Sequence, residues 1–472
     1  MKYLKQINLY LLMIMFLSVF GQSNPKNILF IAVDDLRPLI NSYGNSQMIT
    51  PHLDQLSKSG IQFNNAYCNI AVCGGSRASI MTGIRPSYTR FAKYYSKASE
   101  DTPEAKSLHG LFKQNGYETY SYGKIFHFAE DFESDWTFID DSHEQFDYQT
   151  QDSKAIVKTL DPKGRRKGPA FEFADVKDDK YSDGKITEMA IKRLKKLKNK
   201  TTPFFLAVGY VSPHLPFIQP TKYGNLYKDG DLQLASNPYK IKDAPKNAVH
   251  NSPELRGMYT GIPEKGLLSE ELSKQLIHGY YASVSYTDAL VGKLIKTLDD
   301  LNLRDDTIII LWGDHGFFLG EHGMWTKHST LKEAIHVPLI IDAPGMTSGR
   351  QSNTFVEYID IYPTLCDLTG ITPPTYLHGK SFKSVLVNPE NKHKTEIYTR
   401  YANGEAVVDS DFAYTEFVNN EGFVWANMLF DLNNDPKQNQ DLSNDQNFKD
   451  VVKLYKLKLL EMRNFVNQPP IK

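Results

Sequence analysis

The chain has few cysteines and no surplus of either charge. Its 472 residues contain only three cysteines, Cys68, Cys73 and Cys366, too few for the disulfide framework of a small secreted domain, and an odd number leaves at least one thiol unpaired. Cys68 and Cys366 lie in apolar stretches, where we expect buried thiols rather than a disulfide. The formal net charge of −1 excludes a general attraction to nucleic acid or anionic membranes, so any anion site must be local.

Long apolar runs are also absent, except at the N-terminus. Lys2 and Lys5 precede an apolar run over residues 9–17, and residues 19–21 form a plausible cleavage site. This arrangement predicts a signal peptide over residues 1–21 and therefore an exported protein. Together with the scarcity of cysteine, it favours a bacterial periplasmic protein over a secreted one. An uncleaved anchor is the alternative, but no later run is long enough for a stable membrane span.

Residues 22–388 show the pattern of one large α/β domain. Nearly continuous apolar runs, typical of parallel strands buried on both faces, cover residues 28–33, 204–208, 307–312 and 337–341. Helix patterns alternate with them at residues 51–59, 108–114, 186–197 and 273–302. This alternation predicts an α/β sandwich with a mostly parallel central sheet. The polar residues 131–183 lack clear periodicity and are interpreted as a surface insertion.

The pattern changes after residue 374, and we expect a separate α+β subdomain over residues 389–472. Short strand-like segments cover residues 396–401, 412–418 and 422–430, and a final helix is predicted over residues 448–465. Short strands close together in the chain are typical of an antiparallel sheet.

Acidic residues follow two of the predicted strands. Asp34 and Asp35 come directly after residues 28–33, and Asp314 and His315 follow residues 307–312. Because open α/β sheets place ligands beyond the carboxyl ends of their strands, these side chains should meet at one edge. One such acidic pair is more often a helix cap, but two together favour a metal site. Oxygen-rich ligation favours Ca²⁺, with Mg²⁺ as the less favoured alternative.

Basic residues and a cysteine stand at further predicted strand ends. Lys124 and His127 follow one strand, and His214 lies between two prolines after another, but each signal is weak alone. Cys73 precedes Gly74-Gly75-Ser76-Arg77 and a predicted helix, whose N-terminus would favour an anion. A plain cysteine nucleophile activated by this helix is one interpretation, although it would leave the acidic cluster unexplained.

These motifs, taken in order, resemble the type I sulfatase family. The shared segments are Asp34-Asp35-Leu36-Arg37-Pro38, Cys73-x-x-Ser76-Arg77, Gly123-Lys124-x-x-His127, Ser212-Pro213-His214-x-Pro216 and Gly313-Asp314-His315-Gly316. The first of them, with Leu319-Gly320-Glu321-His322-Gly323, is most similar to the iduronate-2-sulfatase branch. The resemblance covers about residues 27–370 and implies an alkaline-phosphatase-like sandwich.

The resemblance also implies a mechanism and a set of site residues. Cys73 would be oxidised to formylglycine (3-oxoalanine) by a formylglycine-generating or anaerobic maturation enzyme, and its hydrate would attack sulfur to give a sulfo-enzyme intermediate. The implied Ca²⁺ ligands are Asp34, Asp35, Cys73, Asp314 and His315. Arg77 and Lys124 would stabilise the sulfuryl charge, and His127 would help to deprotonate the hydrate. His214 and Lys327 would face the ester oxygen, with His214 as the acid for the leaving alcohol.

The predicted function is therefore the hydrolysis of sulfate esters on a carbohydrate, such as ulvan, carrageenan or glycosaminoglycan fragments. The sequence departs from the family at Gly75, where Pro or Ala is usual, and at Ser212, where iduronate-type enzymes tend to have a basic residue. Two alternatives stay open: a phosphate or phosphonate ester hydrolase of the same superfamily, and a non-catalytic binder of sulfated glycans. We expect the pocket walls to come from residues 88–95, residues 131–183 and the C-terminal subdomain.

Overall fold

The computed structural model describes residues 26–140, 142–159, 168–228, 230–246, 248–419 and 421–471. The predicted signal peptide, residues 1–21, lies outside this part of the chain. Among the described residues, no helix has the length and apolar character needed to cross a membrane.

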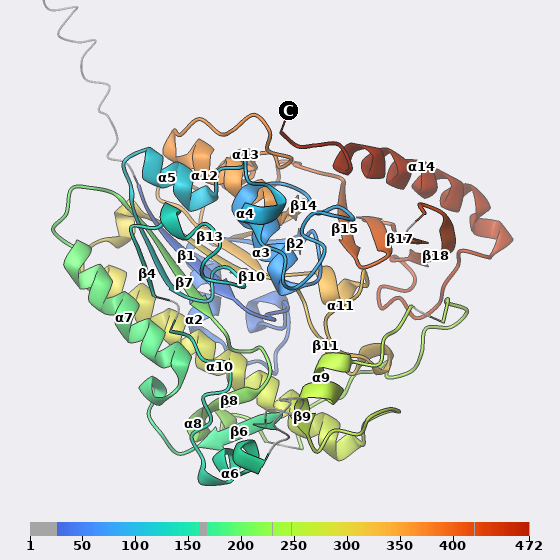
Figure 1. Ribbon diagram of the computed structural model, residues 1–472, viewed down its shortest axis with the longest axis horizontal. Coiled ribbons are helices and arrows are strands. Elements are labelled where there is room, and N and C mark those ends of the chain that lie inside the picture. Colours follow the sequence, from blue (N-terminus) through green and yellow to red (C-terminus); the bar gives the residue numbers. More distant parts are fainter. Residues whose placement is uncertain are drawn as a thin grey trace, which may run out of the picture.

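An eight-stranded sheet forms the centre of the large α/β domain (Figure 1), in the order β14-β2-β13-β10-β1-β7-β3-β4. Its strands are β1 (Asn27–Val33), β2 (Ile61–Tyr67), β3 (Glu118–Gly123), β4 (Phe138–Asp140), β7 (Phe204–Tyr210), β10 (Thr307–Gly313), β13 (Leu339–Asp342) and β14 (Arg350–Glu357). The predicted strand runs 28–33, 204–208 and 307–312 match β1, β7 and β10, which pair in parallel. A mostly parallel central sheet is confirmed.

β13 runs against the rest of the sheet, pairing antiparallel with both β10 and β2. The sequence pattern placed residues 337–341 among the parallel strands, and for this strand it was wrong. The chain leaves β10 at the carboxyl edge and forms only short elements before β13, the longest helix being the four-residue α11 (Lys332–Ile335). Without a long helix to return it to the opposite edge, the chain re-enters the sheet where it left and therefore runs the other way.

Helices cover both faces of the sheet (Figure 1). One face packs against α3 (Cys73–Thr82), α5 (Leu108–Gln114) and α12 (Ile361–Thr369), and the other against α2 (Pro51–Ser59), α7 (Ser182–Leu197) and α10 (Glu270–Asp300). β1 shows the division directly, because Ile28 and Phe30 belong to the first core while Leu29 and Ile31 belong to the second. Alternate side chains of a strand point to opposite faces, so a continuous apolar run fills both layers.

Shorter elements lie around this sandwich. The helices are α4 (Ala98–Asp101), α6 (Gln151–Thr159), α8 (Thr221–Gly224), α9 (Pro253–Met258) and α13 (Lys383–Val387). The strands are β5 (Gly168–Pro169) with β9 (Tyr259–Thr260), β6 (Phe171–Ala174) with β8 (Phe217–Pro220), and β11 (Phe318–Leu319) with β12 (Trp325–Thr326). Residues 131–183 are more than the expected surface insertion, because they supply β4 at the edge of the main sheet. That strand has only three residues, too few for a readable alternation of apolar and polar positions.

The C-terminal region forms the expected antiparallel sheet, which lies beside the sandwich (Figure 1). It contains β15 (Glu396–Tyr401), β16 (Gly404–Asp409), β17 (Phe412–Val418) and β18 (Val424–Asp431), covered by α14 (Lys449–Val466). β16 was not predicted, since it follows a tight turn and carries the buried Glu405 in a short segment. The boundary at residue 389 stays a prediction. Cys68 and Cys366 are free and buried, as expected.

Candidate active site at the carboxyl edge of the sheet

The predicted meeting of two strand ends is present. Asp34 continues the pairing of β1 by donating its backbone N–H to the Tyr210 carbonyl at 3.1 Å, and the Asp314 N–H donates to the Val33 carbonyl at 3.2 Å. Asp34, Asp35, Asp314 and His315 are all fully buried. Asp35 also has a φ of +58°, a left-handed conformation that is uncommon for a residue with a side chain.

Four side chains from these strand ends and from α3 are close enough to share one cation. The possible donor atoms of Asp34, Asp35, Cys73 and His315 all lie within 4.8 Å of one another. Oδ1 of Asp34 and Oδ1 of Asp35 are buried and accept no hydrogen bond. Buried carboxylate oxygens that accept no hydrogen bond are costly unless nearby positive charge neutralises them, so this donor set fits a hard divalent metal.

Asp314 organises the backbone of this site. Its Oδ1 accepts the N–H groups of Asp35 and His315, both at 3.0 Å, and its Oδ2 accepts from Nε of Arg77, also at 3.0 Å. Burial raises the pKa of Asp314, and the neighbouring Asp34 carboxylate raises it further. Each carboxylate oxygen has two lone pairs, so these bonds still leave acceptor capacity. The role of Asp314 as a metal ligand stays a prediction.

Cys73 is the first residue of α3, and its Sγ lies 3.2 Å from Nε2 of His315. Burial raises the pKa of the Cys73 thiol well above its usual value, and the Asp34 carboxylate acts in the same direction. A cysteine that attacks as a plain thiolate needs a depressed pKa instead. In the protein alone, burial and the Asp34 carboxylate therefore oppose thiolate formation at Cys73.

Arg77 and Lys124 place two positive charges beside the possible metal ligands. Nη2 of Arg77 lies 3.4 Å from Oδ1 of Asp34, and Nζ of Lys124 forms a hydrogen bond with the other oxygen of the same carboxylate. Arg77 is fixed from behind by hydrogen bonds to the carbonyls of Lys124 and Ile125. Burial alone would raise the pKa of Asp34, but Lys124, His214 and Arg77 hold it well below its usual value.

His127 lies beside this pair rather than among the metal donors. Burial lowers its pKa to about 3, and the charge of Lys124 adds to the effect. Its Nδ1 is buried without a hydrogen-bond partner, and its ring lies 5.7 Å from that of Tyr94. The imidazole is therefore neutral and, in the protein alone, a weaker base than a free histidine, and its role in deprotonating the hydrate stays a prediction.

His214 and Lys327, both expected to face the ester oxygen, lie together on the other side of Asp35, and their roles stay predictions. Nζ of Lys327 is 3.1 Å from Nε2 of His214 and 3.1 Å from Oδ2 of Asp35. A third residue joins them: Oε1 of Glu254 lies 2.9 Å from Nζ of Lys327 and 3.0 Å from Nε2 of His214. Sequence reasoning missed Glu254, because Pro253 followed by an acid reads only as the start of a helix.

A cleft with a volume of about 830 Å³ adjoins these residues. We call it the tyrosine cleft, and its lining includes Val72, Tyr88, Lys93, Tyr94, Tyr95, His328, Tyr401, Asn403, Asn419 and Arg463. Val72 and His328 are the chain neighbours of Cys73 and Lys327. Two of the expected walls, residues 88–95 and the C-terminal sheet, therefore line it. Residues 131–183 do not, but Nε2 of their Gln145 lies 3.0 Å from Nδ1 of His214.

The structure explains why glycine stands at position 75. A Cβ atom added there would lie 2.1 Å from the carbonyl oxygen of Phe91, and one added at Gly74 would lie 1.9 Å from that of Tyr94. Both distances are far below van der Waals contact, so α3 accepts the backbone of residues 88–95 only because these positions lack side chains. The departure from the family pattern thus places one wall of the tyrosine cleft.

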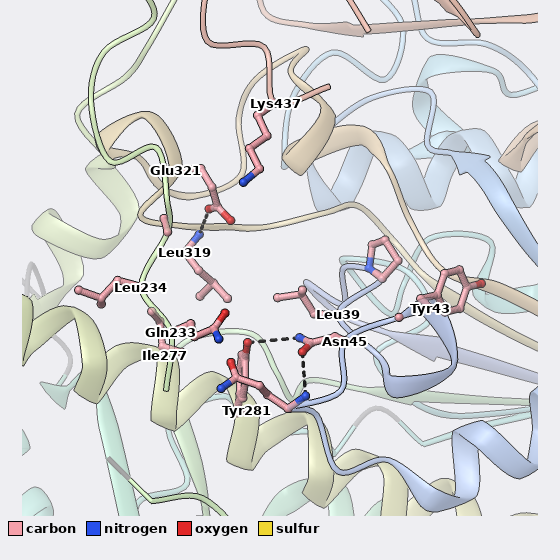
Figure 2. A pocket seen from close by; sticks show the side chains of 14 residues that line it. Leu39, Tyr43, Asn45, Gln233, Leu234, Ile277, Tyr281, Leu319, Glu321 and Lys437 are labelled. Carbon is pink, nitrogen blue, oxygen red and sulfur yellow. Dashed lines mark hydrogen bonds between the residues drawn. The ribbon is translucent and has the colours of Figure 1, made fainter. Parts of the chain in front are cut away.

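A separate pocket of about 430 Å³, shown in Figure 2, contains none of the predicted site residues. Many of its polar groups bind one another. Nδ2 of Asn45 donates to the hydroxyl of Tyr281 at 3.2 Å, and Glu321 accepts from the N–H of Leu319 at 2.7 Å. Glu321 also pairs with Arg37 at 2.7 Å, so its charge is compensated within the protein. This pocket is therefore not the catalytic site.

The sandwich, with its buried charged site at the carboxyl edge of the sheet, has an alkaline-phosphatase-like fold. The fold is similar to that of a phosphonate monoester hydrolase of Agrobacterium radiobacter, with a TM-score of 0.76 and 22% identity, covering 93% of this chain and 96% of that one. At this identity the similarity shows the fold alone.

Sequence comparison gives the family. The Sulfatase family profile matches residues 26–371, and that of the N-sulphoglucosamine sulphohydrolase C-terminal region matches residues 320–465. The chain is 30% identical to human iduronate 2-sulfatase, covering 91% of this chain and 93% of that protein. It is also 30% identical to a sulfatase of Formosa agariphila, with 92% and 86% covered. The chain belongs to the sulfatase family and is a sulfuric ester hydrolase.

Proposed function

We propose that this enzyme hydrolyses sulfate esters on a carbohydrate, using Cys73 after its oxidation to formylglycine, with Ca²⁺ beside it. The observation that carries the proposal is the position of Cys73, whose sulfur lies within 4.8 Å of donor atoms from Asp34, Asp35 and His315. A nucleophile approaching a sulfate ester meets an anion, so a site for this reaction needs concentrated positive charge. The donor group supplies a place for a cation next to the nucleophile.

The residues around Cys73 have complementary roles in this proposal. When bound, Ca²⁺ would supply charge compensation for the sulfate, held by Asp34, Asp35, Asp314 and His315. Arg77 and Lys124 add fixed positive charge, and the neutral imidazole of His127 accepts a proton from the nucleophile. His214, next to Lys327, donates a proton to the leaving alcohol. A sugar alcohol is a poor leaving group, so this proton transfer should contribute about 10²–10⁴-fold in rate.

A carbohydrate substrate is supported by the tyrosine cleft and by the relatives. Tyr88, Tyr94, Tyr95 and Tyr401 present aromatic rings, and Lys93, Asn403 and Asn419 present polar groups, in a cleft that adjoins Cys73. Aromatic faces with a few polar groups around them suit the flat faces and hydroxyls of sugar rings. Iduronate 2-sulfatase is named for a sugar acid. A fragment of a sulfated polysaccharide, such as a glycosaminoglycan, carrageenan or ulvan, fits this site, and residues 1–21 would export the enzyme to it.

The decisive experiment examines Cys73 itself. The protein is produced in a host that matures sulfatases, and the tryptic peptide Ser59–Arg77 is analysed by mass spectrometry. We expect the aldehyde in place of the thiol. In Cys73→Ala, turnover of sulfated oligosaccharides should fall by at least about 10³-fold, because no other side chain replaces the nucleophile.

Each alternative predicts a different result. Near-normal turnover in Cys73→Ala would contradict the proposal. Binding of sulfated glycans without turnover, unchanged in Cys73→Ala, would support a non-catalytic binder. Faster hydrolysis of an aryl phosphate than of the matching aryl sulfate would support a phosphate or phosphonate ester hydrolase.

A further inference from the structure

Lys327 stands on an unusual piece of backbone. The residues on either side of it, Thr326 and His328, have φ angles of +73° and +72°. This left-handed region is disfavoured for residues with a side chain, above all for a β-branched residue such as threonine. Such a conformation persists only where the surrounding structure holds it, and it is concentrated at functional sites.

Residues 250–254 hold this segment from outside, and we call them the α9 brace. Nε2 of His250 lies 2.5 Å from the carbonyl oxygen of Lys327, and the hydroxyl of Ser252 accepts the N–H of Trp325 at 2.8 Å. Glu254, in the first turn of α9, accepts a hydrogen bond from Nζ of Lys327 at 2.9 Å. The brace therefore contacts the backbone around Lys327 and also the tip of its side chain.

Glu254 also reaches the second member of the pair. Its Oε1 lies 3.0 Å from Nε2 of His214, while Nζ of Lys327 lies 3.1 Å from the same nitrogen. An ammonium group disfavours a protonated imidazole beside it, and a carboxylate shared by both groups offsets this repulsion. The Glu254 side chain is only 12% exposed, so water screens these charges weakly.

We propose that Glu254 is a positioning residue that fixes His214 and Lys327 at the leaving-group side of the site. The assignment rests on the proposed function, in which His214 protonates the departing alcohol. Glu254 acts through His214 and Lys327 rather than on the substrate. Replacing Glu254 should therefore lower kcat/KM most for esters whose leaving group needs protonation.

Two aryl sulfates measure this dependence. Phenol is a poor leaving group, whereas 4-nitrophenol leaves with little protonation. In Glu254→Gln, which keeps the size of the side chain but removes its charge, we expect kcat/KM for phenyl sulfate to fall by about 10²-fold. The loss for 4-nitrophenyl sulfate should be only a few-fold. Glu254→Asp keeps a carboxylate and should recover part of the selective loss.

Asp360 offers a matched control. It too is a buried carboxylate shared by a histidine and a lysine, with Oδ2 3.1 Å from Nε2 of His393 and Oδ1 2.7 Å from Nζ of Lys394. In the part of the chain that the structure describes, the Asp360 carboxylate binds Glu357, Lys380, His393 and Lys394 and no predicted site residue. Asp360→Asn should lower stability without changing the ratio of kcat/KM for the two esters.

The outcomes separate this assignment from the proposed function. Equal losses for both esters in Glu254→Gln would overturn it, and so would loss of bound calcium, because Glu254 would then be a metal ligand or a purely structural group. If Glu254→Gln does not fold, an unchanged ester ratio in a folded Glu254→Asp would overturn it. An unchanged ester ratio in His214→Asn would show that His214 is not the acid, and the positioning role of Glu254, which depends on it, would be overturned as well. A wild-type enzyme that carries formylglycine but hydrolyses neither ester contradicts both proposals.

Discussion

The site has two parts that are built in opposite ways. The first is the charge cluster, Asp34, Asp35, Cys73, Arg77, Lys124, Asp314 and His315, in which no residue is more than 6% exposed. The second is the tyrosine cleft, where Tyr94 is 57% and Tyr95 50% exposed. The cluster stands on strand ends and a helix start, while the cleft is lined by residues 88–95, which lie outside helices and strands, and by the C-terminal subdomain, including Tyr401 at the end of β15. We infer that the cluster determines the chemistry and that the cleft determines the substrate.

The largest effect should come from the cluster. In Asp314→Asn, loss of one negative charge disturbs Arg77 and the two N–H groups that Asp314 accepts. We expect kcat/KM to fall by about 10²–10³-fold for every sulfate ester, together with a loss of bound calcium measured by atomic emission. Asp288 is a suitable control, since it is buried and accepts the N–H groups of His52 and Leu53 in α2, at 3.3 and 2.7 Å, rather than binding a predicted site residue. Asp288→Asn should keep both activity and metal content.

A different result would weaken the comparison. If Asp314→Asn lowered activity on a sulfated glycan but not on 4-nitrophenyl sulfate, Asp314 would contribute to substrate selection and not to the chemical step.

Substitutions in the cleft should have smaller effects, and these should be confined to the glycan substrate. Tyr94→Ala removes an exposed ring that contacts Tyr95, with ring centroids 5.0 Å apart, and His127. We expect KM for the sulfated oligosaccharide to rise by about 3–10-fold, the effect of losing one aromatic contact. Hydrolysis of 4-nitrophenyl sulfate should change little. Tyr239, which is 52% exposed and outside the cleft, provides the control. Tyr239→Ala should change neither KM for the oligosaccharide nor the hydrolysis of 4-nitrophenyl sulfate.

Equal losses on both esters in Tyr94→Ala would show that this ring supports His127 rather than the glycan. Tyr401→Ala tests a second wall of the cleft, because the Tyr401 ring packs against His328, with the ring centroids 5.2 Å apart.

The same contrast explains how far the sequence alone could lead. The acids and the histidine of the cluster were predictable because each follows an apolar strand, and parallel strands bring such positions to one edge. The contact between Cys73 and His315 followed from the family resemblance. Glu254 was not predictable, since its partners His214 and Lys327 are distant in the sequence and the brace that carries it has no periodic pattern. The direction of β13 was wrong because it depends on how the chain re-enters the sheet, which the apolar pattern does not record. β16 was missed because its short segment is held in place by pairing with β15 and β17.

Gly75 joins the two parts of the site, and its replacement should have the smallest effect on turnover. Gly75→Ala brings the sequence closer to the family pattern read during maturation, so the formylglycine content of the peptide Ser59–Arg77 should not fall. In the folded protein, however, the new methyl group meets the Phe91 carbonyl and must displace residues 88–95. We expect the free energy of unfolding to fall by about 1–3 kcal/mol, with a few-fold rise in KM for the glycan and little change for 4-nitrophenyl sulfate.

Gly230→Ala is the control, because a Cβ there meets no atom within 4 Å. An unchanged stability in Gly75→Ala would mean that residues 88–95 yield easily, and the glycine would then be explained by maturation rather than by the wall of the cleft.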